Sequence, residues 1–140
     1  MNVYGPRQDY HGAYIAVIMK MLDAIDRGEG PTILGDGSEA FDFVAVEDCG
    51  LANLCAMKAE ASDSFYNVGT GKGSSVLEVI TAFETITEKK LNYKIVDKRE
   101  GDVVQAYANT AKANDVLGWK AKHSLEEALF AAWKWEQKQL

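Results

Sequence analysis

The polar loop Lys98-Arg99-Glu100-Gly101-Asp102 carries the residue types best suited to hold a phosphorylated ligand. The planar guanidinium of Arg99 can bind a phosphate through two parallel hydrogen bonds. The carboxylate of Asp102 can accept hydrogen bonds from ribose hydroxyls. A solvated charged turn has the same composition, and spacing alone favours that plainer interpretation. The loop is therefore a candidate anion site that needs further support.

A second candidate is the glycine-rich turn in YNVGTGKGSSVLEVI, because a phosphate-binding loop needs a strand, a glycine turn and a helix start in that order. The spacing of its glycines does not fit. Gly69, Gly71 and Gly73 give G-x-G-x-G, whereas the dinucleotide fingerprint is G-x-G-x-x-G. Lys72 is followed by glycine, where a P-loop has Ser or Thr. The pattern favours a tight strand-to-helix turn that uses positive φ.

The other titratable residues show no catalytic spacing. His11 and His123 have no acid or nucleophile at a telling distance, so we expect both at the surface. Glu47 and Asp48 are adjacent, and adjacent residues seldom converge on one bond. Asp48 is better explained as the N-cap of a helix. We predict no catalytic residue and no metal site in this chain.

Composition limits the classes of protein that fit. The chain has 140 residues, 47% of them apolar, and a net charge of -6. This length predicts a single domain over residues 1–140. The acidic balance argues against a nucleic-acid surface. No apolar run approaches the roughly 20 residues that span a bilayer, and the N-terminus lacks a signal-peptide pattern, so we expect no membrane partner.

The two cysteines, Cys49 and Cys55, have no His or Cys companion at metal-ligand spacing. We predict two small buried thiols, which suit a reducing cytoplasm. Trp119, Trp133 and Trp135 are expected to be packing residues.

The elements that must position the candidate loops alternate between helix and strand. Helical periodicity and caps predict helices from Tyr14 to just before Gly28, from Asp48 to Glu60, from Ser75 through Ile86, from Thr110 to Gly118, and from Ser124 onwards. Two of these helices begin with an S-x-x-E capping box, formed by Ser75 with Glu78 and by Ser124 with Glu127. The segments PTIL, FDFVAV, FYNVG, NYKIV and VVQAYA predict strands. This alternation indicates an α/β fold.

Five segments in a fixed order carry a resemblance to a known family: NVYGPRQ, GDGSEAFDFVAVEDCGLAN, FYNVGTGKGSSVLEVI, KREGD and NTAKANDVLGW. Together they resemble the C-terminal half of NAD-dependent nucleotide-sugar epimerases and dehydratases, which are extended short-chain dehydrogenase/reductases. The resemblance covers essentially the whole chain and is closest to the UDP-glucose 4-epimerases. It implies an α/β, substrate-binding C-terminal portion that lacks most of the Rossmann domain.

The resemblance also implies what to look for in a catalytic member. Such enzymes carry NAD on a glycine-rich loop near the N-terminus and use a Y-x-x-x-K pair. No tyrosine of this chain has a lysine four residues later. We therefore expect this chain alone to bind no NAD and to be inactive. Whether Met1 is a natural start or a truncation stays open.

The resemblance assigns the substrate-binding residues position by position. Asn2 matches an asparagine that touches the diphosphate or sugar, and Ile33 and Leu34 match a strand that lines the base. Val76 matches another neighbour of the base. Arg99 matches the arginine that binds the diphosphate, and Asp102 matches the acid that takes a ribose hydroxyl. These six residues are the predicted nucleotide-sugar site.

Two positions depart from the family pattern. Phe41 stands where many relatives have a phosphate-binding arginine, and Ala45 stands where others have tyrosine. These departures leave the nucleotide sugar, and the choice between epimerase and dehydratase, undefined. Two alternatives to the fragment interpretation remain. The chain could be a stand-alone, non-catalytic module that binds a nucleotide or pairs with a separate Rossmann half, or a structural domain whose ligand site has decayed.

The same resemblance predicts association. Strands near NVYG and FYNVG would pair with the Rossmann sheet in a complete family member. An uncovered strand edge with apolar flanks tends to recruit another chain. We expect a homo-oligomer with Val3, Tyr4, Phe65 and Val68 at or near the contact.

Overall fold

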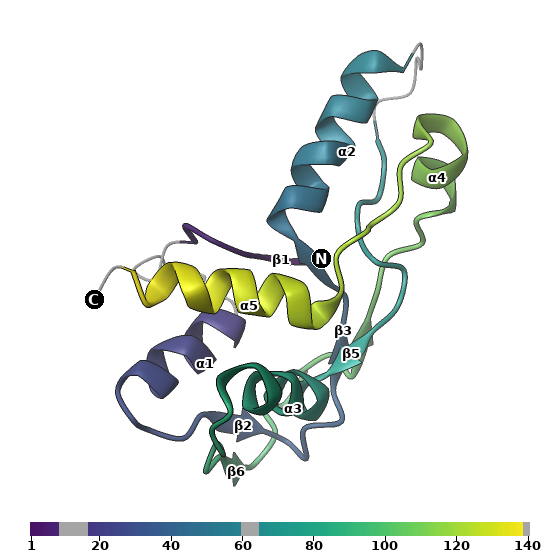
Figure 1. The fold of residues 1–140 in the computed structure, drawn as a ribbon. Helices are drawn as coiled ribbons and strands as arrows, with labels where there is room; N and C mark the ends of the chain where they lie inside the picture. Colours follow the sequence, from purple (N-terminus) through teal and green to yellow (C-terminus); the bar gives the residue numbers. More distant parts are fainter. Residues whose placement is uncertain (9–16, 60–64, 139–140) are drawn as a thin grey trace.

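The computed structural model describes residues 1–8, 17–59 and 65–138. Figure 1 shows helices packed around short strands, and the predicted α/β class is confirmed. The elements are β1 (Asn2–Tyr4), α1 (Val17–Asp26), β2 (Thr32–Leu34), β3 (Ala40–Phe41), β4 (Phe43–Ala45), α2 (Val46–Lys58), β5 (Ser74–Ser75), α3 (Val76–Thr87), β6 (Lys94–Val96), β7 (Gln105–Ala106), α4 (Ala111–Leu117) and α5 (Leu125–Glu136).

The strands form small sheets. β1 pairs with β4 and β2 pairs with β6, both in parallel, while β3 lies between β5 and β7. The prediction of one strand through FDFVAV was wrong, because β3 and β4 belong to different sheets. Asp42, between them, explains the break: its backbone N–H donates to Ala106 O, and its carbonyl accepts from Asn2 N, both at 2.9 Å. The chain therefore changes sheets at this one residue.

The main core lies where α3 and α5 pack together and α5 covers β1 and β4 (Figure 1). Tyr4 is only 2% exposed, its ring meets Phe43 edge to face at 6.3 Å, and its hydroxyl donates to Leu125 O at 3.1 Å. Burial raises the pKa of Tyr4. The core side chains that the helices contribute are buried, among them Ile18, Leu22, Val76, Val79, Phe83, Ala128, Leu129 and Ala132.

Both predicted capping boxes are confirmed. At the start of α3, Ser75 N donates to Glu78 Oε2 at 2.6 Å, and Glu78 N donates to Ser75 Oγ at 3.1 Å. The N–H of Ser75 holds the pKa of Glu78 below its usual range. Ser124 and Glu127 make the same exchange at the start of α5. These local bonds fix where the two core helices begin.

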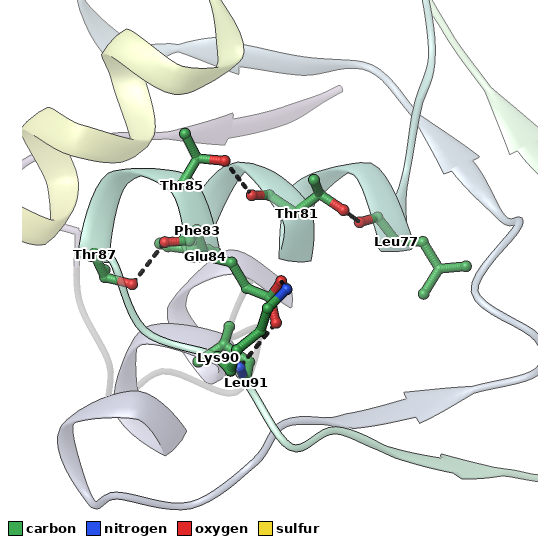
Figure 2. Close-up of polar contacts among 8 residues, drawn as sticks. All are labelled: Leu77, Thr81, Phe83, Glu84, Thr85, Thr87, Lys90 and Leu91. Atoms are coloured by element: carbon green, nitrogen blue, oxygen red, sulfur yellow. Dashed lines mark hydrogen bonds and ion pairs between the residues drawn. The ribbon is translucent and has the colours of Figure 1, made fainter.

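The C-terminal end of α3 leads the chain towards β6 (Figure 2). The hydroxyl of Thr87 donates to Phe83 O at 2.7 Å inside the last turn. Glu84 then accepts from Leu91 N at 2.9 Å and from Lys90 Nζ at 2.6 Å. The Lys90 ammonium lowers the pKa of Glu84. One carboxylate thus holds the turn that follows the helix and sets the start of the path to β6.

The start of α2 differs from the prediction. The helix begins at Val46 with Ala45 at the N-cap, so the assignment of Asp48 as the cap was wrong. Asp48 is fully buried, and its Oδ2 accepts from Lys122 N at 3.1 Å and from His123 N at 3.0 Å. His123 Nδ1 lies 3.1 Å from Asp48 Oδ1, so this histidine is a half-exposed partner of a core carboxylate. The carboxylate joins α2 to the segment before α5.

Two strand predictions were also wrong in extent. Residues 65–68 form no strand; Tyr66 and Val68 pack instead on a second small core around Trp119. Trp119 is buried, as expected, and Trp133 and Trp135 are partly buried. Of VVQAYA, only Gln105–Ala106 is strand, because pairing with β3 is short. His11 and the predicted helix start at Tyr14 lie outside the described residues.

Candidate functional site

A cavity of about 810 Å³ lies between α1, β2, β3, the start of α3 and the loop after β6. All six residues of the predicted nucleotide-sugar site line it: Asn2, Ile33, Leu34, Val76, Arg99 and Asp102. The fold therefore brings together residues that are far apart in the sequence.

Parallel pairing positions two sides of the cavity. β2 and β6 run in the same direction, with Leu34 opposite Val96, so the segments that follow them leave from the same edge. The turn after β2 is tied to the end of β6 by Gly35 N, which donates to Val96 O at 2.9 Å. The carboxyl ends of parallel strands are where ligands bind in many α/β folds.

The Arg99 loop, residues 98–102, forms one wall. Arg99 Nε lies 3.3 Å from Asp102 Oδ2, and the Arg99 side chain is 71% exposed. Gly101 at φ 85° gives the loop its left-handed turn, which returns the chain towards the cavity. The contact with Asp102 uses Nε, so the terminal nitrogens of the guanidinium keep the fork geometry that suits a phosphate.

Another part of the cavity lining is largely apolar. Ile33, Leu34, Phe41 and Val76 contribute to it, and the Phe41 ring lies 6.4 Å from that of Phe43 in an edge-on contact. Phe41, at the position where the family resemblance implies a phosphate-binding arginine, supplies apolar surface to the cavity. This wall suits a flat ring better than a phosphate.

Charged residues of α1 and the turn after it lie at the cavity as well. Arg27 is held by Asp23 at 3.0 Å and by Glu29 at 3.5 Å. Lys20 also lines the cavity. Arg27 is therefore paired with two carboxylates of its own neighbourhood, whereas among the residues that the structure describes Arg99 is paired with one.

Sequence reasoning missed Glu39. This carboxylate lines the cavity two residues before Phe41, and Lys98 Nζ lies 3.5 Å from its Oε1. Residues two apart in an extended segment face the same side, so the alternation Glu39-Ala40-Phe41 was an available signal. The signal is weak, because the strand is only two residues long.

The glycine turn, residues 69–73, does not face this cavity; it wraps around Asp42. The buried Asp42 carboxylate accepts hydrogen bonds from Thr70 N at 2.8 Å, Thr70 Oγ1 at 2.7 Å, Gly71 N at 3.0 Å and Ala108 N at 3.2 Å. Of the glycines in the turn, only Gly71, at φ 79°, adopts positive φ. The turn is an anion site, and the chain's own aspartate fills it.

In residues 1–8, 17–59 and 65–138, no group of three or more His, Cys, Asp or Glu could hold a metal ion. Cys49 and Cys55 are unpaired and only partly buried, so the prediction of two buried thiols was wrong in degree. Burial still raises the pKa of Cys49. No helix in the described part of the chain has the length and apolarity to cross a membrane.

The model of the GDP-mannose 4,6 dehydratase family matches residues 1–131. The chain belongs to this family of nucleotide-sugar epimerases and dehydratases, within the extended short-chain dehydrogenase/reductases. It is 43% identical over 105 residues to UDP-glucose 4-epimerase of Pisum sativum. The aligned region covers 71% of this chain and 30% of that protein. It is 38% identical over 104 residues to UDP-glucose 4-epimerase of Bacillus subtilis, and the aligned region covers 72% of this chain and 31% of that protein.

Solved structures of nucleotide-sugar epimerases have the same fold as this chain. UDP-glucose 4-epimerase of Thermotoga maritima, determined with UDP-glucose, matches with a TM-score of 0.89 at 36% identity, over 99% of this chain and 44% of that chain. UDP-N-acetylglucosamine 4-epimerase of Methanobrevibacter ruminantium, in complex with UDP-N-acetylmuramic acid, matches with a TM-score of 0.91 at 32% identity. This match covers 99% of this chain and 44% of that chain. The match is to the C-terminal part of these epimerases, as predicted. The chain spans less than half the length of the proteins it matches.

Several neighbouring structures contain NAD, among them a UDP-glucose 4-epimerase of Stenotrophomonas maltophila. The glycine turn of residues 69–73 does not fit a dinucleotide. The N–H groups of Thr70 and Gly71 donate to Asp42, and a Cβ on Gly69 would lie 2.5 Å from Asp42 Oδ2. No N–H group of Thr70 or Gly71 is therefore left to donate to a pyrophosphate.

Proposed function

We propose that this chain is the part of a nucleotide-sugar epimerase or dehydratase that holds the nucleotide sugar, and that its ligand is a UDP-sugar or a close analogue. Arg99 binds the diphosphate and Asp102 takes a ribose hydroxyl. Ile33, Leu34 and Val76 pack against the base, and Asn2 contacts the diphosphate or the sugar. The protein works in the cytoplasm.

One observation carries this proposal: the six residues line a single cavity, which combines the exposed guanidinium of Arg99 with the apolar side chains of Ile33, Leu34 and Val76. A nucleotide has the same division between a charged diphosphate and a flat base. The two structures reported above contain UDP-sugars in proteins with the same fold. These facts support a UDP-sugar over a ligand without phosphate.

Calorimetric titration with UDP tests the proposal. Charge-assisted hydrogen bonds contribute about 1.5 to 3 kcal/mol, so Arg99→Ala should weaken UDP binding roughly 10- to 150-fold. Arg27→Ala is the matched control, because Arg27 lines the same cavity but is paired with Asp23 and Glu29. We expect it to change the affinity less than about 3-fold. Equal affinity in wild type and Arg99→Ala would remove Arg99 from the site.

The chain alone is proposed to be inactive, because its sequence has no Y-x-x-x-K pair and its glycine turn encloses Asp42. The check is incubation with NAD and a panel of UDP- and dTDP-sugars, followed by product analysis. We expect no epimerised or dehydrated sugar. Reproducible turnover that depends on the protein would show that the chemistry resides in this chain.

A second candidate function, pairing with another polypeptide, is favoured by exposed apolar residues. Leu51, Leu54 and Met57 of α2 are exposed, Met57 at 82%, and so are Val3 and Phe65. Exposed apolar side chains gain free energy when a partner covers them. Tyr4 cannot take part as expected, because it is buried in the chain's own core.

The partner is proposed to be a second copy of the chain or a separate Rossmann half. Light scattering over a concentration series should show a mass above that of the monomer. Leu54→Glu should shift the mass towards the monomer, since a charge at an apolar contact is costly. A strictly monomeric wild-type chain at high concentration would exclude self-association.

A further inference from the structure

Glu39 is a carboxylate at the cavity to which the proposed function gives no role. The residue is 7% exposed, and its side chain lines the cavity together with Phe41. Burying a charged group is costly unless other polar groups replace the water that it loses. The position of Glu39 therefore raises the question of which groups do so.

The described part of the chain does not fully satisfy the hydrogen-bonding capacity of the Glu39 carboxylate. Oε1 of Glu39 lies 3.5 Å from Lys98 Nζ, a distance that is long for a hydrogen bond. Oε2 is enclosed and has no hydrogen-bond partner in the described part of the chain. The terminal torsion of a glutamate is broad, so the carboxylate can turn to meet a donor without leaving its rotamer. The carboxylate retains the capacity to accept a hydrogen bond from a bound molecule.

The surroundings of Glu39 indicate which part of a nucleotide would meet it. A Cβ on Gly35 would lie 2.3 Å from Glu39 Oε1, so the carboxylate packs against the turn that directly follows Leu34. The backbone carbonyl of Glu39 accepts from Val76 N at 3.1 Å. Leu34, Phe41 and Val76 supply the apolar surface of this end of the cavity. A flat base packed on that surface would present a polar edge to Glu39.

We propose that Glu39 is a specificity-determining residue, which accepts a hydrogen bond from the imide N3–H of a uracil or thymine base. This inference rests on the proposed function. Cytosine carries a lone pair at N3 in place of the N–H, so its ring nitrogen would face the carboxylate without a proton. A charged acceptor makes a stronger hydrogen bond than a neutral one, and it makes the mismatch correspondingly unfavourable.

Calorimetry with UDP, CDP and 3-methyl-UDP tests this assignment. The wild-type chain should bind UDP at least about 10-fold more tightly than either analogue, because both lack the N3 proton. Glu39→Gln replaces the charged acceptor by a neutral amide. It should weaken UDP binding roughly 5- to 30-fold and narrow the ratio of UDP to CDP affinity.

Two control variants distinguish the hydrogen bond that Glu39 accepts from the effect of changing the net charge of the cavity. Lys98→Gln removes the cation beside Glu39 but keeps the acceptor. Glu29→Gln neutralises another carboxylate that lines the cavity, whose side chain is 63% exposed. Each control can change the affinity for all three nucleotides, but the ratio of UDP to CDP affinity should stay at the wild-type value.

The outcomes are distinguishable. A folded Glu39→Gln variant with an unchanged ratio overturns the assignment, and so does equal wild-type affinity for UDP and 3-methyl-UDP. The wild-type comparison decides the matter if Glu39→Gln does not fold. A wild-type chain that binds none of the three nucleotides overturns the proposed function itself, and the role of Glu39 with it.

Discussion

The Asp42 turn (residues 69–73 with the Asp42 carboxylate that they enclose) and the Arg99 loop both contain glycine and groups that can bind an anion, yet their environments are opposite. In the Asp42 turn the N–H donors are satisfied by a buried carboxylate of the same chain. In the Arg99 loop the guanidinium is exposed, and its one ion pair within residues 1–8, 17–59 and 65–138 is with Asp102. The first region contributes to stability, and the second is available for a ligand.

This comparison shows why a local pattern does not identify a binding site. Backbone N–H groups in a glycine turn bind whatever anion the fold supplies. Asp42 lies 28 residues before Thr70, so nothing in the turn itself reveals that its anion is internal. Distant residues decide whether such a turn is structural or functional.

The largest effect should follow Asp42→Asn. The amide puts an NH₂ group where the carboxylate accepts from Thr70, Gly71 and Ala108, so buried donors lose their charged acceptor. We expect a loss of about 3 kcal/mol or more in the free energy of unfolding, measured by urea denaturation. Asp36→Asn is the control, because Asp36 caps an exposed turn through Ser38. Equal denaturation midpoints for the two variants would contradict the structural role of Asp42.

A smaller effect is expected from Gly69→Ala. The new Cβ would lie 2.5 Å from Asp42 Oδ2 and 2.8 Å from Ala108 Cβ, so the turn would have to move. Overpacking of this kind costs about 1 to 3 kcal/mol. Gly50→Ala is the matched control: Gly50 lies within α2 with no atom within 4 Å of an added Cβ, and the change should stabilise the chain by about 0.5 to 1 kcal/mol. Thermal unfolding of both variants would show whether the signs differ as expected.

The smallest effect on stability should come from Arg99→Ala, although the same change is expected to impair UDP binding. Its ion pair with Asp102 is exposed and 3.3 Å long, and such pairs contribute little. We expect the free energy of unfolding to stay within about 0.5 kcal/mol of wild type. A large loss of stability in urea would mean that Arg99 supports the fold.

The parts of the fold that sequence could predict are those fixed by neighbours along the chain. Ser75 and Glu78 lie three residues apart, so their capping box was visible in the sequence and appears in the structure. The break between β3 and β4 was not visible, because it depends on Asn2 and Ala106, which lie far from Asp42 in sequence. Asp48 was misassigned for the same reason: its partners are Lys122 and His123.

The candidate site divides in a similar way. Spacing alone pointed to Arg99 and Asp102 and could not separate a ligand site from a solvated turn. Family resemblance supplied Asn2, Ile33, Leu34 and Val76, and the fold then brought them to one cavity. Glu39 was missed, because its significance lies in burial and in an oxygen without a partner among the described residues. Neither property can be inferred from a residue's type.

The most direct test of the central claim is a nuclear magnetic resonance titration of the isotope-labelled chain with UDP, followed through assigned backbone amides. The claim is that the cavity binds the nucleotide and that the Asp42 turn does not. We expect saturable shifts at Leu34, Gly101 and Asp102, and unchanged signals at Thr70 and Gly71, whose N–H groups are bound to Asp42. Shifts at Thr70 and Gly71 with unchanged cavity signals, or no shifts at all, would contradict the account.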